Sequence, residues 1–302
     1  MNVAAVTASR ATTQSLRTGG NKDRNVASLV FLCALWFSLF FGVAVLVVLI
    51  VDTAIAGAGR FDANLFTNYE STVRKGETGF RAGILGSLWL MMSTALLAIP
   101  LGIASAVYLE EFADSRAWYN KFVEVNLQNL AAVPSIIYGM LAAAIMTILG
   151  YTYQGIVLGG AIALALLILP VIIISTREAL RAVPQEIRHG SLALGATVWQ
   201  TTWRQVLPSA VPGIATGTIL GLSRAIGEAA PLIMIGVATV RFDPAWLTDK
   251  VAALPVQIYN LASAPQEELQ QAASAAIILL LLMILGMNAL AILIRNKFQR
   301  NW

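Results

Sequence analysis

Residues 125–176 read VNLQNLAAVPSIIYGMLAAAIMTILGYTYQGIVLGGAIALALLILPVIIIST and contain no Asp, Glu, Lys or Arg. This run is far longer than the roughly 20 apolar residues with which a helix crosses a bilayer core of about 30 Å. A turn between Gly150 and Gly155 divides it at a point typical of a membrane interface. The stretch therefore predicts two consecutive transmembrane helices, 125–148 and 156–176, in an all-α membrane protein.

The bulk composition agrees with a chain whose solvent is largely lipid. Of 302 residues, 58% are apolar and only 12% are charged, and the mean hydropathy is +0.73. A soluble domain carries about twice that charged fraction. The single cysteine, Cys33, excludes an intrachain disulfide and a cysteine-based metal site, and the single histidine, His189, excludes a histidine cluster. We therefore expect no metal and no cofactor bound by this chain.

Four further apolar runs complete a set of six predicted spans. They cover residues 28–51, 83–109, 212–240 and 270–294. Six spans place both termini on the same side of the membrane. The expected organisation is a disordered tail over 1–27 and a transmembrane domain over 28–302, with a cytoplasmic hairpin at 177–211. Gly83, Gly86, Gly159 and Gly160 are typical of positions where helices pack closely.

The distribution of basic residues orients the chain. The tail and the segments on its side of the membrane hold 13 Lys and Arg residues, whereas the loops on the opposite side hold 6. By the positive-inside rule, both termini are predicted to be cytoplasmic, in a plasma membrane. This topology accounts for the basic residues, so no nucleic-acid-binding surface is predicted. Glu110, Glu111 and Asp114 are interpreted as a solvated cytoplasmic charge cluster.

The hairpin at 177–211 carries helix signals on both sides of a glycine. Pro184 is typical of the first helical position, and Gly195 is typical of a helix end in the left-handed conformation. Thr197 precedes Gln200 by three residues, the order of a capping box. A second helix is predicted to end at Leu207, before Pro208. Trp199 lies on this helix, on the same face as Trp203.

The fifth predicted span contains Arg224 and Glu228, four residues apart. Charged side chains inside a membrane are costly and usually face a polar interior, so both are candidates for a substrate pathway. The guanidinium group matches the geometry of a tetrahedral oxyanion. Phosphate still carries a proton at neutral pH and can donate a hydrogen bond to Glu228, whereas sulfate cannot. The alternative is a structural ion pair that fixes the span to a neighbouring helix.

The cytoplasmic hairpin resembles the coupling loop of ABC importer permeases. Gly195, nine further residues, and then Gln205-Val206-Leu207-Pro208 follow that family's spacing. His189, Gly190 and Ser191 stand where the family has Glu-Ala-Ala. The resemblance implies a type I permease fold in which His189, Gly190, Ser191, Gly195, Trp199, Leu207 and Pro208 belong to the loop that contacts the ATPase. The alternative is a hairpin that only joins two spans.

Two other stretches resemble phosphate importer permeases of the PstA type. They are Leu130–Gly139 (LAAVPSIIYG) and Ser223–Pro231 (SRAIGEAAP). The resemblance implies a subunit that imports inorganic phosphate and is not itself an enzyme. Its implied partners are a PstC-type permease, an ATPase dimer that uses ATP, and an extracytoplasmic phosphate-binding protein. Arg177 and Glu178 lie near a second charge pair of that family, although their spacing differs and ordinary interfacial anchors are the alternative.

Three other functions remain open at the level of sequence. The first is a permease for another oxyanion, such as phosphonate. The second is an ion-coupled secondary carrier, although such carriers often show inverted repeats and no convincing repeat is present. The third is a membrane sensor or scaffold. The chain has no Gly-Lys dipeptide and therefore no phosphate-cradling P-loop, so any ATP hydrolysis is assigned to a partner.

Overall fold

The computed structural model describes residues 26–114 and 117–298. The tail predicted over 1–27 lies outside the described residues except for Val26 and Ala27, which begin helix α2. The chain divides after Asp52 into two compact units, and each is considered separately. The first unit contains most of α2 (Val26–Gly57), a continuous apolar helix that includes the first predicted span.

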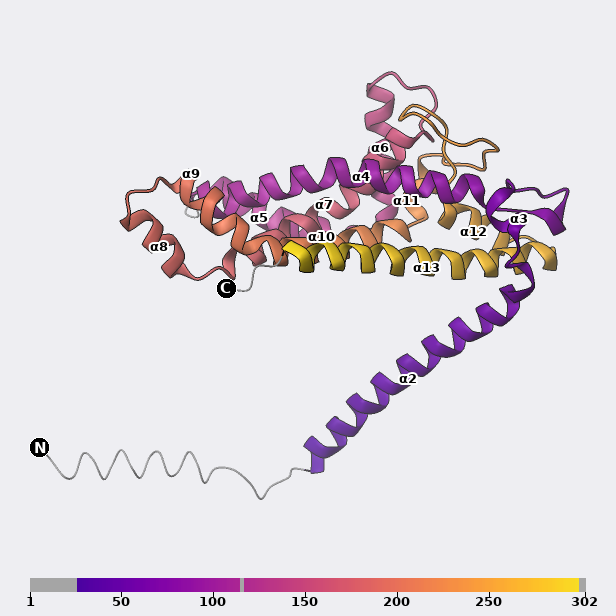
Figure 1. Ribbon diagram of the computed structural model, residues 1–302, viewed down its shortest axis with the longest axis horizontal. Helices are drawn as coiled ribbons and strands as arrows, with labels where there is room; N and C mark the ends of the chain where they lie inside the picture. The colour runs from indigo at the N-terminus through magenta and orange to yellow at the C-terminus, as the bar shows by residue number, and fades with distance from the viewer. Residues whose placement is uncertain (1–25, 115–116, 299–302) are drawn as a thin grey trace, which may run out of the picture. The chain divides into compact units, whose positions relative to one another are not determined.

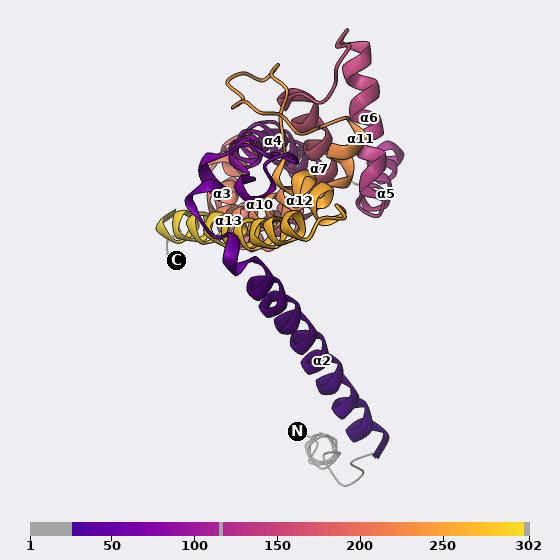
Figure 2. The same ribbon diagram turned by 90° about the vertical axis from the view of Figure 1, so that its right-hand side faces the viewer.

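Four long helices of the second unit pack against one another. They are α4 (Arg81–Val107), α7 (Val157–Arg181), α10 (Leu207–Ile226) and α13 (Glu267–Phe298). In Figure 1 they run side by side, and Figure 2 shows them from their ends. Helix α7 contacts both α4 and α10, and α13 packs on α10. Each of α4, α7 and α10 has an internal proline, Pro100, Pro170 and Pro212 respectively.

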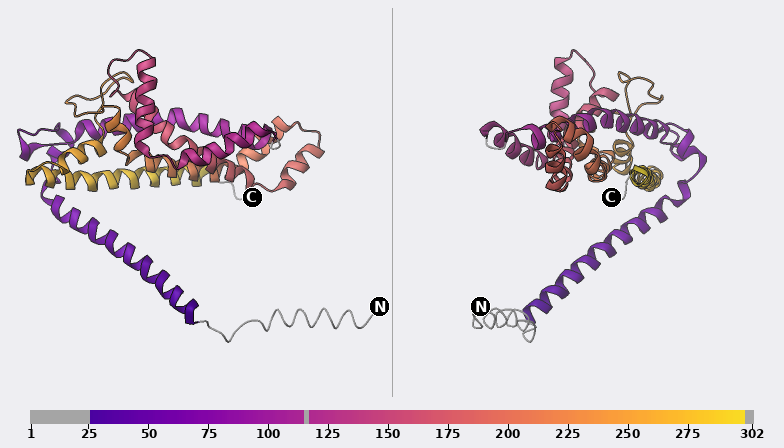
Figure 3. Two further views of the ribbon diagram at one scale, coloured as in Figure 1. Left: turned by 180° about the vertical axis from the view of Figure 1, so that it is seen from behind. Right: turned by 60° about the vertical axis from the view of Figure 1, so that its left-hand side comes forward.

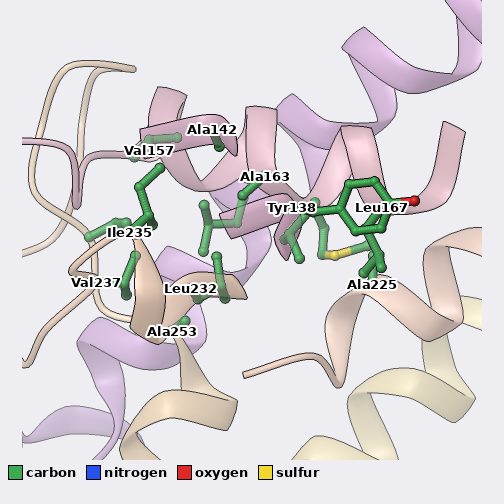
Figure 4. Close-up of a cluster of buried hydrophobic side chains, with 14 of the residues drawn as sticks. Tyr138, Ala142, Val157, Ala163, Leu167, Ala225, Leu232, Ile235, Val237 and Ala253 are labelled. Carbon is green, nitrogen blue, oxygen red and sulfur yellow. The ribbon is translucent and has the colours of Figure 1, made fainter. Parts of the chain in front are cut away.

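Close helix packing depends on glycines, as the sequence predicts. An ideal Cβ atom on Gly86 would lie 2.0 Å from the carbonyl oxygen of Ala252, and one on Gly160 would lie 2.6 Å from Leu90 Cδ2. Any larger side chain would push these elements apart. The main hydrophobic cluster lies around α7, and Figure 4 shows Tyr138, Leu167, Ala225, Leu232 and Ile235 among its members.

The predicted span 125–148 is not one straight helix. It consists of α5 (Trp118–Ala131) and α6 (Ser135–Ile148), which meet at an angle of 112°. The left view of Figure 3 shows α6 leaving the direction of α5. Pro134 explains the break, because the residue before a proline is driven out of the helical conformation and the proline lacks an N–H group. The bend lies inside the LAAVPSIIYG stretch.

The predicted span 212–240 also differs from the structure. Helix α10 ends at Ile226 with Gly227 as its C-cap, and a short helix α11 (Ala230–Met234) follows. Pro231 lies in the first turn of α11, where its missing N–H costs no internal hydrogen bond. Residues 235–253 form an irregular segment, and α12 (Leu254–Ala262) then packs on α4 and α13.

The second helix of the hairpin does not stop at Pro208. Helix α8 (Gln185–Ala193) is followed by α9 (Val198–Thr201) and a π-helical turn, η4 (Thr202–Val206), which continues directly into α10. Pro208 has no backbone N–H group and cannot donate a helical hydrogen bond. The wider π-helical turn just before Leu207 changes the hydrogen-bonding pattern there, so the helix can continue through the proline. Pro184 also lies one position earlier than predicted, as the N-cap of α8.

A second π-helical turn, η3 (Tyr108–Phe112), ends α4. On the opposite end of the bundle, η1 (Ala58–Arg60), α3 (Ala63–Thr67) and η2 (Lys75–Glu77) form the connection between α2 and α4. Among the described residues, five helical segments are long and apolar enough to cross a membrane, and a sixth is added if α5 and α6 count as one broken span. Apart from one isolated bridge between Ile156 and Lys250, these residues form no β-structure.

Candidate functional site

Arg224 and Glu228 form an ion pair at the end of α10. Arg224 Nε lies 3.5 Å from Glu228 Oε1, and the two side chains are 44% and 24% exposed. Because α10 ends at Ile226, Glu228 lies in the turn before α11 and not on the same continuous helix. The pair therefore occupies a break in backbone structure. Freed backbone groups and two charges occur together at this point.

The two stretches that carry the resemblance meet at this break. Gly139 of α6 faces α11 so closely that an ideal Cβ on it would lie 2.5 Å from the carbonyl oxygen of Pro231. Tyr138 donates a hydrogen bond to the carbonyl oxygen of Leu130 across the α5–α6 bend, at 2.5 Å. On the other side, Ser223 is hydrogen-bonded to Asn288 of α13. The residues on either side of the Arg224–Glu228 pair thus contact α6 through Pro231 and α13 through Ser223.

Arg224 ends an exposed stripe along α10. Exposed positions recur at Gly213, Thr216, Leu220, Arg224 and Gly227, with the three- and four-residue spacing of one helix face. The opposite face carries Ile214, Gly217, Gly221 and Ala225 and is buried against the bundle. Within the described residues, the ion pair recorded for Arg224 is with Glu228 of its own segment. The interpretation of Arg224 as a lock to a neighbouring helix therefore has no support in this part of the chain.

Arg177 lies in a separate charge network near the C-terminal end of α7. Its Nε atom lies 3.2 Å from Glu110 Oε2, and its Nη2 atom lies 3.0 Å from Glu124 Oε1. Arg181, one turn further along α7, approaches the same carboxylates at 2.8 and 3.7 Å. Glu178 is exposed and joins none of these ion pairs. The structure thus assembles a network around Arg177 and leaves out its sequence neighbour.

The interpretation of Glu110 and Glu111 as solvated charges is wrong. The Glu110 side chain is 17% exposed and the Glu111 side chain is 9% exposed, and each is held by arginine. Glu124, the third carboxylate of this region, was not identified from sequence. The available signal was the spacing of Arg177 and Arg181, which share one face of α7 and therefore require acidic partners if that face is buried.

The hairpin corner has the predicted geometry. Gly195 has φ of +84°, which L side chains rarely adopt. The Gly195 N–H donates to the carbonyl oxygen of Leu192 at 2.9 Å, and the Ala196 N–H donates to that of Ser191 at 3.2 Å, so α8 ends in a Schellman motif. Thr197 and Gln200 form the predicted capping box. Glycine corner and capping box together turn the chain sharply between α8 and α9.

The remaining hairpin candidates lie on an accessible surface. His189, Gly190 and Trp199 are exposed, and Ser191 Oγ shares a hydrogen bond of 2.9 Å with Thr201 Oγ1. Trp199 and Trp203 pack with ring centroids 5.3 Å apart. Leu207 and Pro208 belong to the first turn of α10. A cavity of about 610 Å³ lies between α8 and α9, lined by Glu186, Gly190, Ser191, Gly195, Gln200 and Arg204 among others.

A buried carboxylate lies at the other end of the bundle, outside the candidate spans. Glu70 is 5% exposed and accepts hydrogen bonds from Thr239 Oγ1 at 3.0 and 3.1 Å. Burial raises the pKa of the Glu70 carboxyl, while the Thr239 hydroxyl and the positive charge of Arg241 oppose that change. Within residues 26–114 and 117–298, no group of three or more His, Cys, Asp or Glu residues could hold a metal ion.

The family model for the "binding-protein-dependent transport system inner membrane component" matches residues 98–300. This match includes the hairpin, the Arg177 network and the Arg224–Glu228 pair. The chain belongs to this permease family. The permease is therefore a multi-pass membrane component of a transport system, and the candidate residues above lie within its family domain.

Relatives of the permease include proteins named for phosphate transport. It is 30% identical over 273 residues to the phosphate transport system permease protein PstA of Yersinia pestis, covering 90% of each chain. It is 37% identical over 194 residues to the protein of the same name from Mycobacterium leprae, covering 62% of this chain and 61% of the relative. It is also 34% identical over 202 residues to the probable ABC transporter permease YqgI of Bacillus subtilis, covering 66% and 67% respectively.

Solved structures place the permease in the fold of ABC importers. A bacterial transporter that imports the polysaccharide alginate matches with a TM-score of 0.59 at 15% identity, covering 96% of this chain and 100% of that chain. The inward-facing methionine transporter MetNI matches with a TM-score of 0.58 at 18% identity, covering 73% and 95%. At these identities the similarity establishes the fold alone.

Proposed function

We propose that this permease is a transmembrane subunit of an ATP-driven importer that moves inorganic phosphate across the plasma membrane. The observation that carries the proposal is the Arg224–Glu228 pair at the end of α10, on an exposed stripe and at a break in the helix. Relatives at 30% and 37% identity that are named phosphate permeases support the same substrate.

The chemistry of the pair favours a protonated oxyanion. The guanidinium of Arg224 can donate two parallel, charge-assisted hydrogen bonds to phosphate oxygens. The carboxylate of Glu228 can accept a hydrogen bond from the P–OH group that phosphate retains near neutral pH. A fully ionised anion such as sulfate has no proton to donate, so Glu228 repels it. Because Arg224 Nε and Glu228 Oε1 are 3.5 Å apart, the interaction between the two side chains is weak. The guanidinium can therefore bind a ligand.

The exposed stripe on α10 supports a pathway that this chain shares with a second subunit. Thr216, Leu220 and Arg224 are exposed in the part of the chain that the structure describes. Since a half-exposed guanidinium facing lipid is costly, we assign this face to a partner permease of PstC type and to the water-accessible passage between the two. The proposal places both termini in the cytoplasm, as the distribution of basic residues predicts.

Energy for transport is assigned to a separate ATPase dimer. The proposed contact is the exposed corner formed by α8, Gly195 and α9, with His189, Gly190, Ser191 and Trp199 on its surface. An extracytoplasmic phosphate-binding protein would deliver the ligand to the opposite side. The permease itself needs no cofactor in this scheme and is not an enzyme.

The test is uptake of labelled inorganic phosphate in cells that depend on this permease. Arg224→Ala is expected to reduce the uptake rate by about 100-fold at equal membrane abundance, since a guanidinium–oxyanion interaction is worth about 1.5–3 kcal/mol or more in a desolvated site. Arg74→Ala is the matched control, because Arg74 lies in an exposed loop away from α10 and should leave uptake near wild type. Wild-type uptake by Arg224→Ala would contradict the proposal.

Phosphonate import is the alternative that this geometry leaves open. A phosphonate monoanion also carries a proton, so Glu228 does not separate it from phosphate. Competition of labelled phosphate uptake by unlabelled methylphosphonate and by sulfate distinguishes the substrates. Strong competition by phosphonate alone would favour the alternative. Family membership argues against an ion-coupled secondary carrier and against a sensor.

A further inference from the structure

Two adjacent carboxylates at the end of α4 form ion pairs with two different helices. Glu110 and Glu111 both lie in the π-helical turn η3. Glu110 faces α7, where it meets Arg177 and Arg181. Glu111 instead meets Arg188 of α8, with Oε1 2.8 Å from Nη2. The end of α4 is thereby joined to the hairpin directly, and not only through α7.

Arg188 connects three segments with one side chain. Besides its ion pair with Glu111, its Nη1 donates to the carbonyl oxygen of Val183 at 2.7 Å and its Nη2 donates to that of Leu180 at 2.8 Å. Leu180 lies in the last turn of α7, where its carbonyl oxygen also accepts from the Val183 N–H at 3.2 Å, and Val183 lies just beyond the helix. Arg188 thus caps α7, anchors α8 and holds η3.

Burial sets this pair, like the neighbouring Arg177–Glu110 pair, apart from the exposed ion pairs of the described residues. The Arg188 and Glu111 side chains are 13% and 9% exposed, whereas those of the loop pair Arg74–Glu77 are 80% and 60% exposed. An exposed pair is screened by water and contributes little. A buried pair with further hydrogen bonds is costly to break, because each lost partner leaves an uncompensated charge. The Glu111–Arg188 pair is therefore a firm link.

Helix α8 has little else to attach it. No residue between Gln185 and Ala193 is buried, so α8 has no hydrophobic core contact that could hold it against the bundle. The Ser191–Thr201 hydrogen bond connects it only to α9, within the same hairpin. Helix α8 also contacts η4. Among the described ion pairs, Glu111–Arg188 is the one that joins α8 to the end of α4, so a displacement of α8 relative to α4 acts on it.

We propose that Glu111 and Arg188 are positioning residues that transmit movement of the hairpin to α4. This inference rests on the proposed function, in which an ATPase displaces the hairpin. When α8 moves, Arg188 pulls η3 through Glu111 and moves the end of α7 through its two carbonyl bonds. Arg177 and Arg181 hold the neighbouring Glu110, so α4 and α7 move as one body at this end.

The experiment uses the complete transporter in proteoliposomes with its ATPase and binding protein. Two rates are measured for each variant: ATP hydrolysis and uptake of labelled inorganic phosphate. For Glu111→Gln, we expect assembly and ATP hydrolysis near wild type, with the ratio of phosphate imported to ATP hydrolysed reduced about tenfold. Glu268→Gln removes the same charge from an exposed position in the first turn of α13 and should leave the ratio unchanged.

A charge exchange tests the contact itself. Arg188→Glu alone should lose coupling, and the double variant Glu111→Arg with Arg188→Glu should recover part of it, because the attraction is restored although the carbonyl bonds are not. A coupling ratio at the wild-type value in Glu111→Gln would overturn the proposal. So would a loss of uptake that merely follows a loss of assembled complex, since that outcome assigns the pair a static role.

A second readout separates this inference from the proposed function. Spin labels on Leu194 at the hairpin tip and on Leu96 of α4, both exposed, report whether the two elements move together when ATP binds. We expect the nucleotide-dependent change in α4 position to disappear in Glu111→Gln. If the wild-type complex imports no phosphate but still shows that change, the proposed substrate fails and the transmission role stands. If the change persists in Glu111→Gln, the transmission role fails.

Discussion

Glu228 lies one turn beyond Arg224, but helix α10 ends between them, so the 3.5 Å ion pair spans a helix terminus. The carboxylate therefore has backbone freedom that a residue inside a helix lacks. It can approach a ligand held by Arg224 or withdraw from it. In the proposed function, selectivity would depend on Glu228 and affinity on Arg224.

Replacing Glu228 with Gln should weaken discrimination between phosphate and sulfate. The amide removes the negative charge that repels a fully ionised anion, and it supplies an N–H donor that sulfate can use. We expect sulfate to inhibit labelled phosphate uptake roughly tenfold more effectively than in wild type, a change of about 1.4 kcal/mol. Uptake without competitor is the control. Unchanged inhibition by sulfate would contradict the role assigned to Glu228.

Glu110→Gln should destabilise the permease more than Glu124→Gln. Both substitutions remove one charge from the same network, but the Glu110 side chain is 17% exposed and that of Glu124 is 39% exposed. The loss for Glu110 leaves Arg177, itself 11% exposed, with a single partner. We expect a cost of about 2 kcal/mol for Glu110→Gln and under about 1 kcal/mol for Glu124→Gln. Thermal unfolding in detergent measures the loss of stability in both variants. Equal losses would show that burial of the carboxylate does not determine the cost of removing its charge.

Gly195→Ala and Gly190→Ala should have opposite effects on the hairpin. At Gly195, φ is +84°, so an alanine side chain is expected to cost about 1–2 kcal/mol. Gly190 lies inside α8 with open space around its Cα atom, so alanine there should stabilise the helix by up to about 1 kcal/mol. Hydrogen exchange of the α8 amide groups reports both changes. Faster exchange in Gly190→Ala would contradict this interpretation.

Glu70→Gln should stabilise the permease at neutral pH and flatten its pH dependence. The folded-state pKa of Glu70 is raised above its ordinary value of 4.5, mainly by burial. The stability contributed by this group is therefore fully present below that value and is lost as the pH rises through the folded-state pKa. Gln keeps an oxygen acceptor for Thr239 without a buried charge. We expect the melting temperature at pH 7.5 to rise by about 2 °C relative to wild type, with a smaller gain at pH 4.

Hydrophobic runs in the sequence predicted the long helices but not their breaks. Helices α4, α7 and α13 include the predicted spans 83–109, 156–176 and 270–294 to within a few residues, since an apolar run of that length has few other stable forms in a membrane. The 112° bend at Pro134 lies inside a run without charged residues, and the end of α10 at Ile226 lies inside a run that only Arg224 and Glu228 interrupt. Hydropathy alone cannot show a change of direction, although Pro134 marks the first place and Gly227 marks the second.

The charge networks were harder to predict because their partners are far apart in sequence. Arg224 and Glu228 are neighbours, so their pairing follows from spacing. Arg177 meets Glu110 across 67 residues, and Arg188 meets Glu111 across 77. A single sequence does not reveal which loops fold together, and acidic residues at a predicted helix end are usually solvated. Burial by three packed elements reverses that expectation here.

Pro100, Pro170 and Pro212 give the three central helices a common property. Each proline removes one rung of backbone hydrogen bonding, so each helix consists of two stiff rods joined at a pliant residue. Rods joined in this way can change their relative tilt while the side chains on either side of the joint keep their neighbours. The bundle can therefore bend at these three prolines. The close packing at glycines such as Gly86 and Gly160 is kept when it does so.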